Sequence, residues 1–287
     1  MKGKRIFETA AVILGILVFY AVVLVSCENK VIYHPHVYPE GEWHAADGLA
    51  VEDVWFKASD GTKLHGWYFP ATEARATLLF FHGNAGNLTH RVDNIQRLMP
   101  LGLNVFIFDY RGYGKSEGAP DEAGLLKDAQ AAYDTLVKER KVPPDTVILF
   151  GRSLGGAFAA DVAYHNPAAG LILEAAFTNA RDMAGAMFPV LPIGWAIRSK
   201  LNAVDKVPDI TIPKLIIHGT DDEVVPYRLG RKLYDAAAEP KAFYDLPGVG
   251  HNNTYRLGGQ AYFDRIHRFV DEALADSKPK LSNKQAP

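Results

Sequence analysis

The sequence GRSLG at Gly151–Gly155 decides the fold. It follows Thr146–Phe150, an apolar run typical of a buried strand, and stands just before a helix predicted to begin near Leu154. A G-x-S-x-G sequence between a strand and a helix is a tight turn whose glycines avoid steric clashes. The turn pushes the Ser153 hydroxyl out at the carboxyl edge of the sheet, where the helix N-terminus favours developing negative charge. We therefore predict that Ser153 is a nucleophile.

Strands and helices alternate along the rest of the chain. Two strands, Val51–Ala58 and Lys63–Phe69, flank an Asp-Gly turn and are predicted to pair antiparallel. Most of the later strands are near-continuous apolar runs, as expected where helices cover both faces of a parallel sheet. The pattern predicts an α/β fold with a mostly parallel, eight-stranded sheet flanked by helices. The later strands are predicted at Thr77–Phe81, Asn104–Phe108, Thr146–Phe150, Gly170–Glu174, Pro213–His218 and Lys241–Leu246.

Length and composition predict one large domain. The chain has 287 residues, of which 48% are hydrophobic, enough for a well-buried core once the termini are set aside. We place the domain at residues 51–275, after a linker at 27–50 and before a polar, disordered tail at 276–287. An irregular, apolar and Met-containing stretch near 175–212 is predicted to form a short cap over the site. Its side chains either line a pocket for an acyl chain or pack the cap onto the sheet.

The N-terminal segment 1–26 is predicted to be a signal or membrane-anchor segment. A basic start precedes Ala10–Val25, an uncharged, largely apolar stretch near the lower length limit for crossing a bilayer. The positive charges predict that the N-terminus stays in the cytoplasm and that the domain lies on the extracytoplasmic side. The single cysteine, Cys27, either ends a lipobox and carries a lipid anchor, or follows a transmembrane helix that is retained.

Charge and composition exclude several other classes. The net charge of −2 lacks the basic excess of a nucleic-acid-binding protein. A single cysteine excludes internal disulfides and a cysteine-rich zinc site. Three histidines in the linker, His34, His36 and His44, have no carboxylate or cysteine spaced to complete a metal site. We therefore expect no metal and no cofactor.

A serine nucleophile needs a base, and His251 is the predicted one. It lies in the loop after the last predicted strand, from which its imidazole can reach back over Ser153. The competitors His82 and His218 each end a strand just before a glycine. A histidine at such a position more often shapes a loop or bonds to the backbone.

The orienting acid and the oxyanion donors are expected at the same edge of the sheet. Asp221 and Asp222 follow the strand that ends at His218, and spacing alone does not separate them. The oxyanion donors are predicted to be the backbone N–H groups of Leu154, directly after the nucleophile, and of Asn84 in the loop HGNAGN. That loop lacks the GK[ST] ending of a P-loop, which disfavours a phosphate-binding loop.

Five motifs together resemble a known family: HGNAGN, DYRGYGKSEG, GRSLGG, HGTDDEVVP and GHNN. Their order and spacing resemble those of α/β-hydrolase-domain serine hydrolases, over about residues 51–275. The closest group looks like the membrane-associated branch that includes protein depalmitoylases, near the prolyl-oligopeptidase-type hydrolases. The resemblance implies the α/β-hydrolase fold, and it implies that Asp222, fifth in the HG-x-x-D pattern, is the acid of the triad. It also implies that Asp109 and Arg111 belong to a structural loop beside the site.

These features predict a serine hydrolase that cleaves carboxylic ester or thioester bonds through an acyl-enzyme at Ser153. Its partners are then a small-molecule or acylated substrate and, through the N-terminal anchor, a membrane. One alternative is a serine aminopeptidase-like peptidase, which a substrate-filtering domain or a negative patch would favour. Another is a non-catalytic, membrane-tethered scaffold of the same fold, against which the intact triad argues. Dehalogenase or epoxide hydrolase chemistry requires an aspartate in place of Ser153.

Overall fold

The computed structural model describes residues 27–189, 194 and 197–277, together with parts of the segment 4–23. Its central sheet contains β2 (Glu52–Lys57), β3 (Lys63–Phe69), β4 (Ala76–Phe81), β6 (Leu103–Asp109), β7 (Val147–Arg152), β8 (Gly170–Glu174), β9 (Lys214–Gly219) and β10 (Lys241–Leu246). The strand order is β10-β9-β8-β7-β4-β6-β3-β2. The strands pair in parallel except for β2 with β3 and β3 with β6. This confirms the predicted mostly parallel, eight-stranded sheet.

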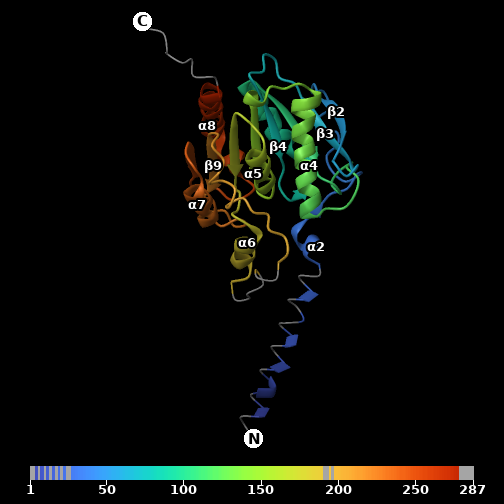
Figure 1. Cartoon of the computed structure of the whole chain (residues 1–287), viewed down its shortest axis with the longest axis vertical. Coiled ribbons are helices and arrows are strands. Elements are labelled where there is room, and N and C mark those ends of the chain that lie inside the picture. Colours follow the sequence, from blue (N-terminus) through green and yellow to red (C-terminus); the bar gives the residue numbers. More distant parts are fainter. Residues whose placement is uncertain are drawn as a thin grey trace.

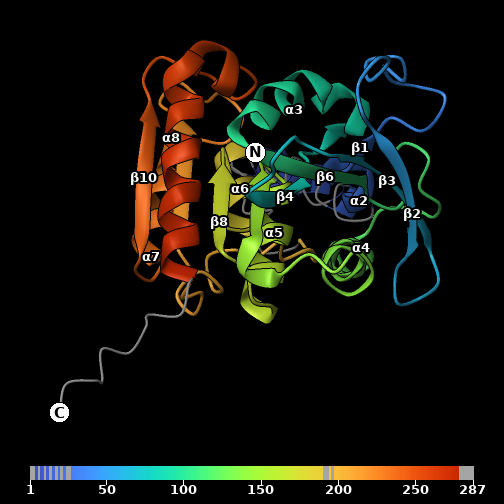
Figure 2. The same cartoon turned by 90° about the horizontal axis from the view of Figure 1, so that it is seen from above.

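Helices cover both faces of this sheet (Figures 1 and 2). They are α3 (Val92–Leu98), α4 (Glu122–Asp134), α5 (Gly155–His165), α7 (Tyr227–Ala236) and α8 (Thr254–Ser277), with short helical turns at Leu88–Arg91, Met99–Leu101, Thr135–Glu139 and Pro144–Thr146. Helices α4, α5 and α7 bury apolar side chains in a cluster on one face, and α3 and α8 in a cluster on the other. Along β7, Leu149 enters the first cluster, and Ile148 and Phe150 enter the second. Burial on both faces explains why the strands are continuous apolar runs.

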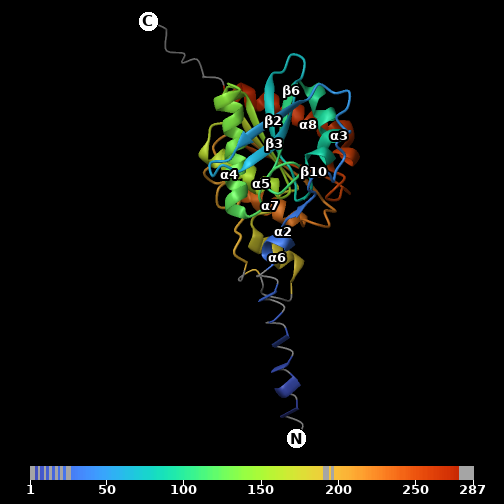
Figure 3. The ribbon, with the colours of Figure 1, turned by 90° about the vertical axis from the view of Figure 1, so that its right-hand side faces the viewer.

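Two helices lie together at the end of the molecule from which the N-terminal segment extends: α2 (Glu28–Ile32) and α6 (Ala180–Met187) (Figures 1 and 3). The Glu28 carboxylate accepts the backbone amides of Arg198 at 3.0 Å and Ser199 at 2.6 Å. The helix that enters the domain is therefore tied to the segment that follows α6.

Part of the predicted linker is packed on the domain. After α2, strand β1 (His34–Pro35) pairs in parallel with β5 (Ala85–Gly86), and Tyr33 is only 2% exposed. The linker thus contacts the HGNAGN loop. At the other terminus, α8 continues through Ser277, two residues into the predicted tail, and residues 278–287 lie outside the described residues.

Helix α5 begins against β4 with no room for a side chain. A Cβ atom at Gly155 would lie 2.0 Å from the Phe81 carbonyl oxygen. A Cβ atom at Gly151 would lie 2.6 Å from the Gly155 carbonyl oxygen. Because only glycine fits at these two positions, they set the distance between helix and sheet and hold Ser153 at the edge between them.

The close approach at Gly155 predicts a specific stability loss. We expect Gly155→Ala to lower the free energy of unfolding by about 1–3 kcal/mol, because the new methyl group must displace backbone. Denaturant unfolding followed by circular dichroism measures the change. Gly185→Ala is the control, since a Cβ there meets no atom within 4 Å and α6 gains a better helix former. Equal stabilities of the two variants would contradict the packing argument.

Candidate active site

The turn that carries Ser153 is strained and fixed by backbone hydrogen bonds. Ser153 has a φ of 53°, in the left-handed region. Such a conformation costs a non-glycine residue about 1–3 kcal/mol. The Ser153 amide donates to the Glu174 carbonyl oxygen at 2.8 Å, and the Gly156 amide donates to the Ser153 carbonyl oxygen at 2.9 Å. These bonds tie the turn to β8 and to the first turn of α5.

Ser153, His251 and Asp222 are joined by consecutive hydrogen bonds. Ser153 Oγ donates to His251 Nε2 over 3.1 Å, and His251 Nδ1 donates to Asp222 Oδ2 over 2.8 Å. The three residues follow β7, β10 and β9, so the sheet edge brings them together. Their exposed fractions are only 8%, 6% and 8%. The structure thus assembles the serine, histidine and aspartate predicted from the sequence.

Asp222 is held as a carboxylate from two sides. Its Oδ1 accepts the amides of Val224 at 2.9 Å and Val225 at 2.7 Å. Burial alone would raise the pKa of Asp222, but hydrogen bonds from His218, His251 and the Val225 amide lower this pKa well below its usual range. Asp222 therefore stays ionised at neutral pH and keeps the Nδ1 proton of His251 in place.

Neither of the two nearby competitors, Asp221 and His218, takes the place of the predicted acid or base. Asp221 accepts the hydroxyl of Thr220 at 2.9 Å. His218 Nε2 donates to the Val225 carbonyl oxygen at 2.9 Å and lies 3.4 Å from Asp222 Oδ2. The geometry therefore connects Asp222, and not Asp221, to the histidine beside the serine.

An ion pair that the sequence analysis missed holds the loop of His251. Arg152 lies inside the GRSLG motif, and its Nε donates to Glu174 Oε1 at 3.1 Å while its Nη2 donates to the His251 carbonyl oxygen at 2.8 Å. Glu174 is fully buried and also accepts the hydroxyl groups of Thr254 and Tyr262. The one signal for it in the sequence is a glutamate at the end of the otherwise apolar strand GLILE.

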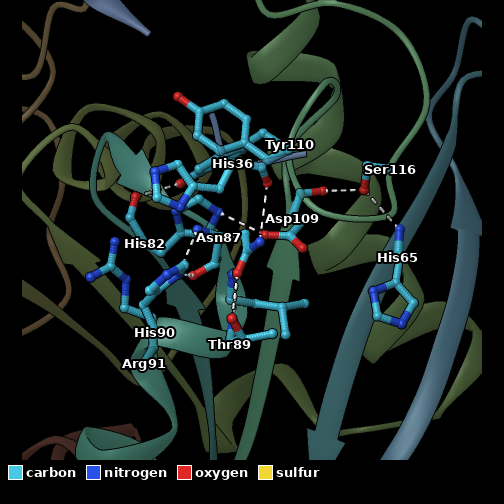
Figure 4. Close-up of polar contacts among 12 residues, drawn as sticks. His36, His65, His82, Asn87, Thr89, His90, Arg91, Asp109, Tyr110 and Ser116 are labelled. Atoms are coloured by element: carbon cyan, nitrogen blue, oxygen red, sulfur yellow. Dashed lines mark hydrogen bonds and ion pairs between the residues drawn. The ribbon is translucent and has the colours of Figure 1, made fainter. Parts of the chain in front are cut away.

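Buried polar contacts stabilise the HGNAGN loop and the residues next to it (Figure 4). His82 Nδ1 donates to the carbonyl oxygen of the next residue at 2.7 Å, and its Nε2 lies 3.4 Å from Asp109 Oδ1. The same Asp109 oxygen accepts the Leu88 amide at 2.8 Å. Arg111 bonds to Asp128 at 2.7 Å. These contacts give Asp109 and Arg111 positions that suit the structural loop implied by the resemblance.

The two residues predicted as oxyanion donors border one cavity. Asn84 and Leu154 line it together with Ser153. The Asn84 side chain is engaged elsewhere, because its Oδ1 accepts the His34 amide at 3.0 Å and the Tyr113 hydroxyl at 3.3 Å. The side chain thus fixes the loop to the linker, and only the backbone amide of Asn84 matches the predicted role.

The cavity beside Ser153 has a volume of about 450 Å³. Met183, Met187 and Phe188 line it, so the predicted cap residues do face a pocket. The volume is within the range of about 300–1,000 Å³ that is usual for small-molecule sites. Among the described residues, no cluster of three or more His, Cys, Asp or Glu side chains could hold a metal ion.

A serine, a histidine and an aspartate at the carboxyl edge of a mostly parallel sheet define a class, the hydrolases of the α/β-hydrolase fold. The chain belongs to the α/β-hydrolase family. It is 36% identical to the α/β-hydrolase domain-containing protein WAV2 of Arabidopsis thaliana, over 92% of this chain and 94% of that protein. It is 37% identical to an uncharacterized protein of Mycobacterium tuberculosis, over 95% and 98%. The model of the family described as serine aminopeptidase, S33, matches residues 72–202.

Solved structures share the fold. An esterase of Pyrococcus furiosus, Pf2001, superposes with a TM-score of 0.70 at 20% identity, over 85% of this chain and 98% of that chain. An α/β hydrolase of Vibrio vulnificus superposes with a TM-score of 0.67 at 25% identity, over 79% and 83%. The α/β-hydrolase fold predicted from the five motifs is thereby confirmed. The membrane-associated, depalmitoylase-like branch stays a prediction.

Removal of the Asp222 charge is expected to abolish most activity. We expect Asp222→Asn to lower kcat for an ester by about 10⁴-fold, because the amide no longer holds the histidine in its correct tautomer. Asp221→Asn is the matched control and should change kcat less than about threefold, because Asp221 bonds to Thr220. Steady-state kinetics measures both. Similar losses in the two variants would refute the assignment.

Proposed function

We propose that this protein hydrolyses carboxylic ester or thioester bonds through an acyl-enzyme on Ser153. One observation carries the proposal: Ser153 Oγ, His251 and Asp222 are linked by hydrogen bonds of 3.1 and 2.8 Å at the wall of a cavity. Geometry of this kind makes the serine a nucleophile and the imidazole its base.

The reaction follows from these contacts. Ser153 Oγ attacks the acyl carbonyl carbon while His251 Nε2 takes the hydroxyl proton. The tetrahedral intermediate collapses, the bond to the leaving oxygen or sulfur breaks, and His251 returns the proton to that atom. Water then attacks the acyl-enzyme with His251 again as base, which releases the acid and restores Ser153. Asp222 stabilises the imidazolium in each step without taking its proton.

The oxyanion is proposed to form between the backbone amides of Leu154 and Asn84. The amides of Ser153 and Gly156 are already used by the Glu174 and Ser153 carbonyl oxygens within the turn. Leu154 follows directly at the N-terminal end of α5, where the helix dipole favours negative charge.

The cavity wall favours an ester over a peptide with a free amino terminus. An aminopeptidase needs a carboxylate that is free to bind the substrate ammonium group. Glu28 is the only carboxylate among the described residues that line the cavity, and it already accepts the amides of Arg198 and Ser199. The apolar cap residues, among them Met187 and Phe188, suit an acyl chain.

Replacement of the nucleophile tests the proposal directly. We expect Ser153→Ala to lower kcat for short para-nitrophenyl esters at least about 10³-fold, because the acyl-enzyme cannot form. A fluorophosphonate probe should label the wild type and not the variant. An acyl-length series on the same esters, with an aminoacyl para-nitroanilide as comparator, separates esterase from peptidase. Unchanged ester turnover in Ser153→Ala would end the proposal.

We also propose that the N-terminal segment tethers the domain to a membrane, with the domain on the extracytoplasmic side. Helical residues described within 4–23 carry apolar side chains that are 50–76% exposed, namely Phe7, Val12, Ile16, Phe19 and Val22. No helix among the described residues is both long and apolar enough to span a bilayer. Cys27 is exposed next to Glu28, which borders the cavity, so a lipid on Cys27 would bring the cavity close to the membrane surface.

The form of the tether can be read from the mass of the protein. We expect the membrane-extracted chain to begin at a lipid-modified Cys27, because a small-residue sequence precedes the single cysteine. Intact mass spectrometry measures this, and Cys27→Ser should leave the precursor uncleaved. A chain that retains the residues before Cys27 in the wild type would contradict the lipid anchor.

A further inference from the structure

Two guanidinium groups line the cavity, and among the described residues only that of Arg152 forms an ion pair. Arg152 is paired with Glu174 and also donates to the His251 carbonyl oxygen. Arg91 donates Nη2 to the Ala85 carbonyl oxygen. Its Nε is buried and has no acceptor, and no carboxylate among the described residues forms an ion pair with it.

Burial makes this arrangement costly for the free protein. Burial, and next the positive charge of Arg152, lower the pKa of Arg91 to about 10, so the group is still a cation at neutral pH. Arg91 is partly exposed, and a largely desolvated charge without an ion pair is unfavourable unless a ligand supplies the partner. The carboxylate of Asp109 acts on Arg91 through its charge but forms no ion pair with it: Asp109 Oδ1 accepts the Leu88 amide, and Figure 4 shows the Arg91 side chain turned away from Asp109. The Arg91 cation therefore lines the cavity without an ion-paired carboxylate among the described residues.

The position of Arg91 indicates which part of a substrate would meet it. Arg152, whose charge acts on Arg91, bonds to the His251 carbonyl oxygen and to Asn252 Oδ1. Arg91, Arg152 and Asn252 thus belong to the polar part of the cavity wall, which includes the loop of His251, whereas α6 supplies apolar residues. His251 must protonate the leaving group, so the leaving group lies on the polar side.

We propose that Arg91 binds an oxyanionic group, a carboxylate or a phosphate, on the leaving group of the substrate. The inference rests on the proposed ester hydrolysis at Ser153 and adds to it a substrate class: esters with an apolar acyl chain and an anionic alcohol portion. A guanidinium suits this role, because its planar N–H fork matches two oxygens of one anion.

The wild-type enzyme tests the proposal without any substitution. The probes are butanoyl esters of para-hydroxybenzoate and of para-hydroxyphenyl phosphate, with the butanoyl ester of methyl para-hydroxybenzoate as the neutral comparator. Each kcat/KM is divided by the rate of uncatalysed hydrolysis in the same buffer. We expect a preference of about tenfold to a hundredfold for one or both anionic esters, the range for a hydrogen-bonded charge. The two anionic arms distinguish a carboxylate site from a phosphate site.

Substitutions then assign the preference to one side chain. Arg91→Met should remove the preference, and Arg91→Lys should retain part of it. Arg97→Met is the matched control: Arg97 lies on α3, is half exposed and pairs with Asp93, so its loss should leave the preference unchanged. Because the readout is a ratio of two substrates, a general loss of folded enzyme does not change it.

Several outcomes would overturn the inference. Wild-type enzyme that hydrolyses the neutral ester without preferring either anionic ester refutes the anion site and leaves the esterase proposal standing. A preference that survives in Arg91→Met assigns it to another group. A preference for para-nitrophenyl hydrogen succinate over para-nitrophenyl butanoate, with none among the phenol esters, places the anion on the acyl side and refutes the leaving-group assignment. Absence of hydrolysis of every ester refutes both proposals.

Discussion

The contact between helix α5 and the carboxyl end of β4 is the constraint on which the site depends. At Gly155 the helix backbone approaches the Phe81 carbonyl oxygen so closely that no Cβ fits. This forces the sharp turn in which Ser153 takes a φ of 53°. The strain persists because both partners of the turn are fixed: the sheet lies between two buried apolar clusters, and α5 packs into one of them. The position of the nucleophile is thus a consequence of core packing.

The same turn also positions the base. Arg152 precedes Ser153, and its guanidinium reaches the His251 carbonyl oxygen across the sheet edge while Glu174 neutralises it. Glu223 adds a second contact by accepting the His251 amide at 3.1 Å. A buried ion pair of this kind contributes little net stability, since desolvation offsets the attraction. Its effect here is geometric, because it connects the loop that carries His251 to the turn that carries Ser153.

Much of the fold and the central residues of the site could be predicted from local patterns. Strands that are buried on both faces are continuous apolar runs, and the sharp strand-to-helix turn requires the sequence G-x-S-x-G. The strands and the nucleophile Ser153 can therefore be predicted from the sequence. Spacing alone does not separate Asp221 from Asp222; the family resemblance implies Asp222, and the hydrogen bond of Asp222 to His251 agrees with it. Contacts between residues far apart in the sequence could not be predicted, because no local sequence pattern accompanies them. Arg152 lies 99 positions from His251, and the linker helix α2 borders the cavity through tertiary packing alone.

The charged side chains divide the cavity wall into a polar part and an apolar part. Arg152 is paired with Glu174, and the Asp222 carboxylate accepts hydrogen bonds from amides and from the histidines beside it. Among the described residues Arg91 forms no ion pair, and Arg91 and the N-terminus of α5 both favour negative charge near Ser153. The cap contributes apolar atoms, and α2 brings Glu28, the residue after Cys27, to the same cavity. An amphiphile with an apolar acyl chain and an anionic head would match both walls, and such molecules concentrate at membrane surfaces, where the proposed tether would place this cavity.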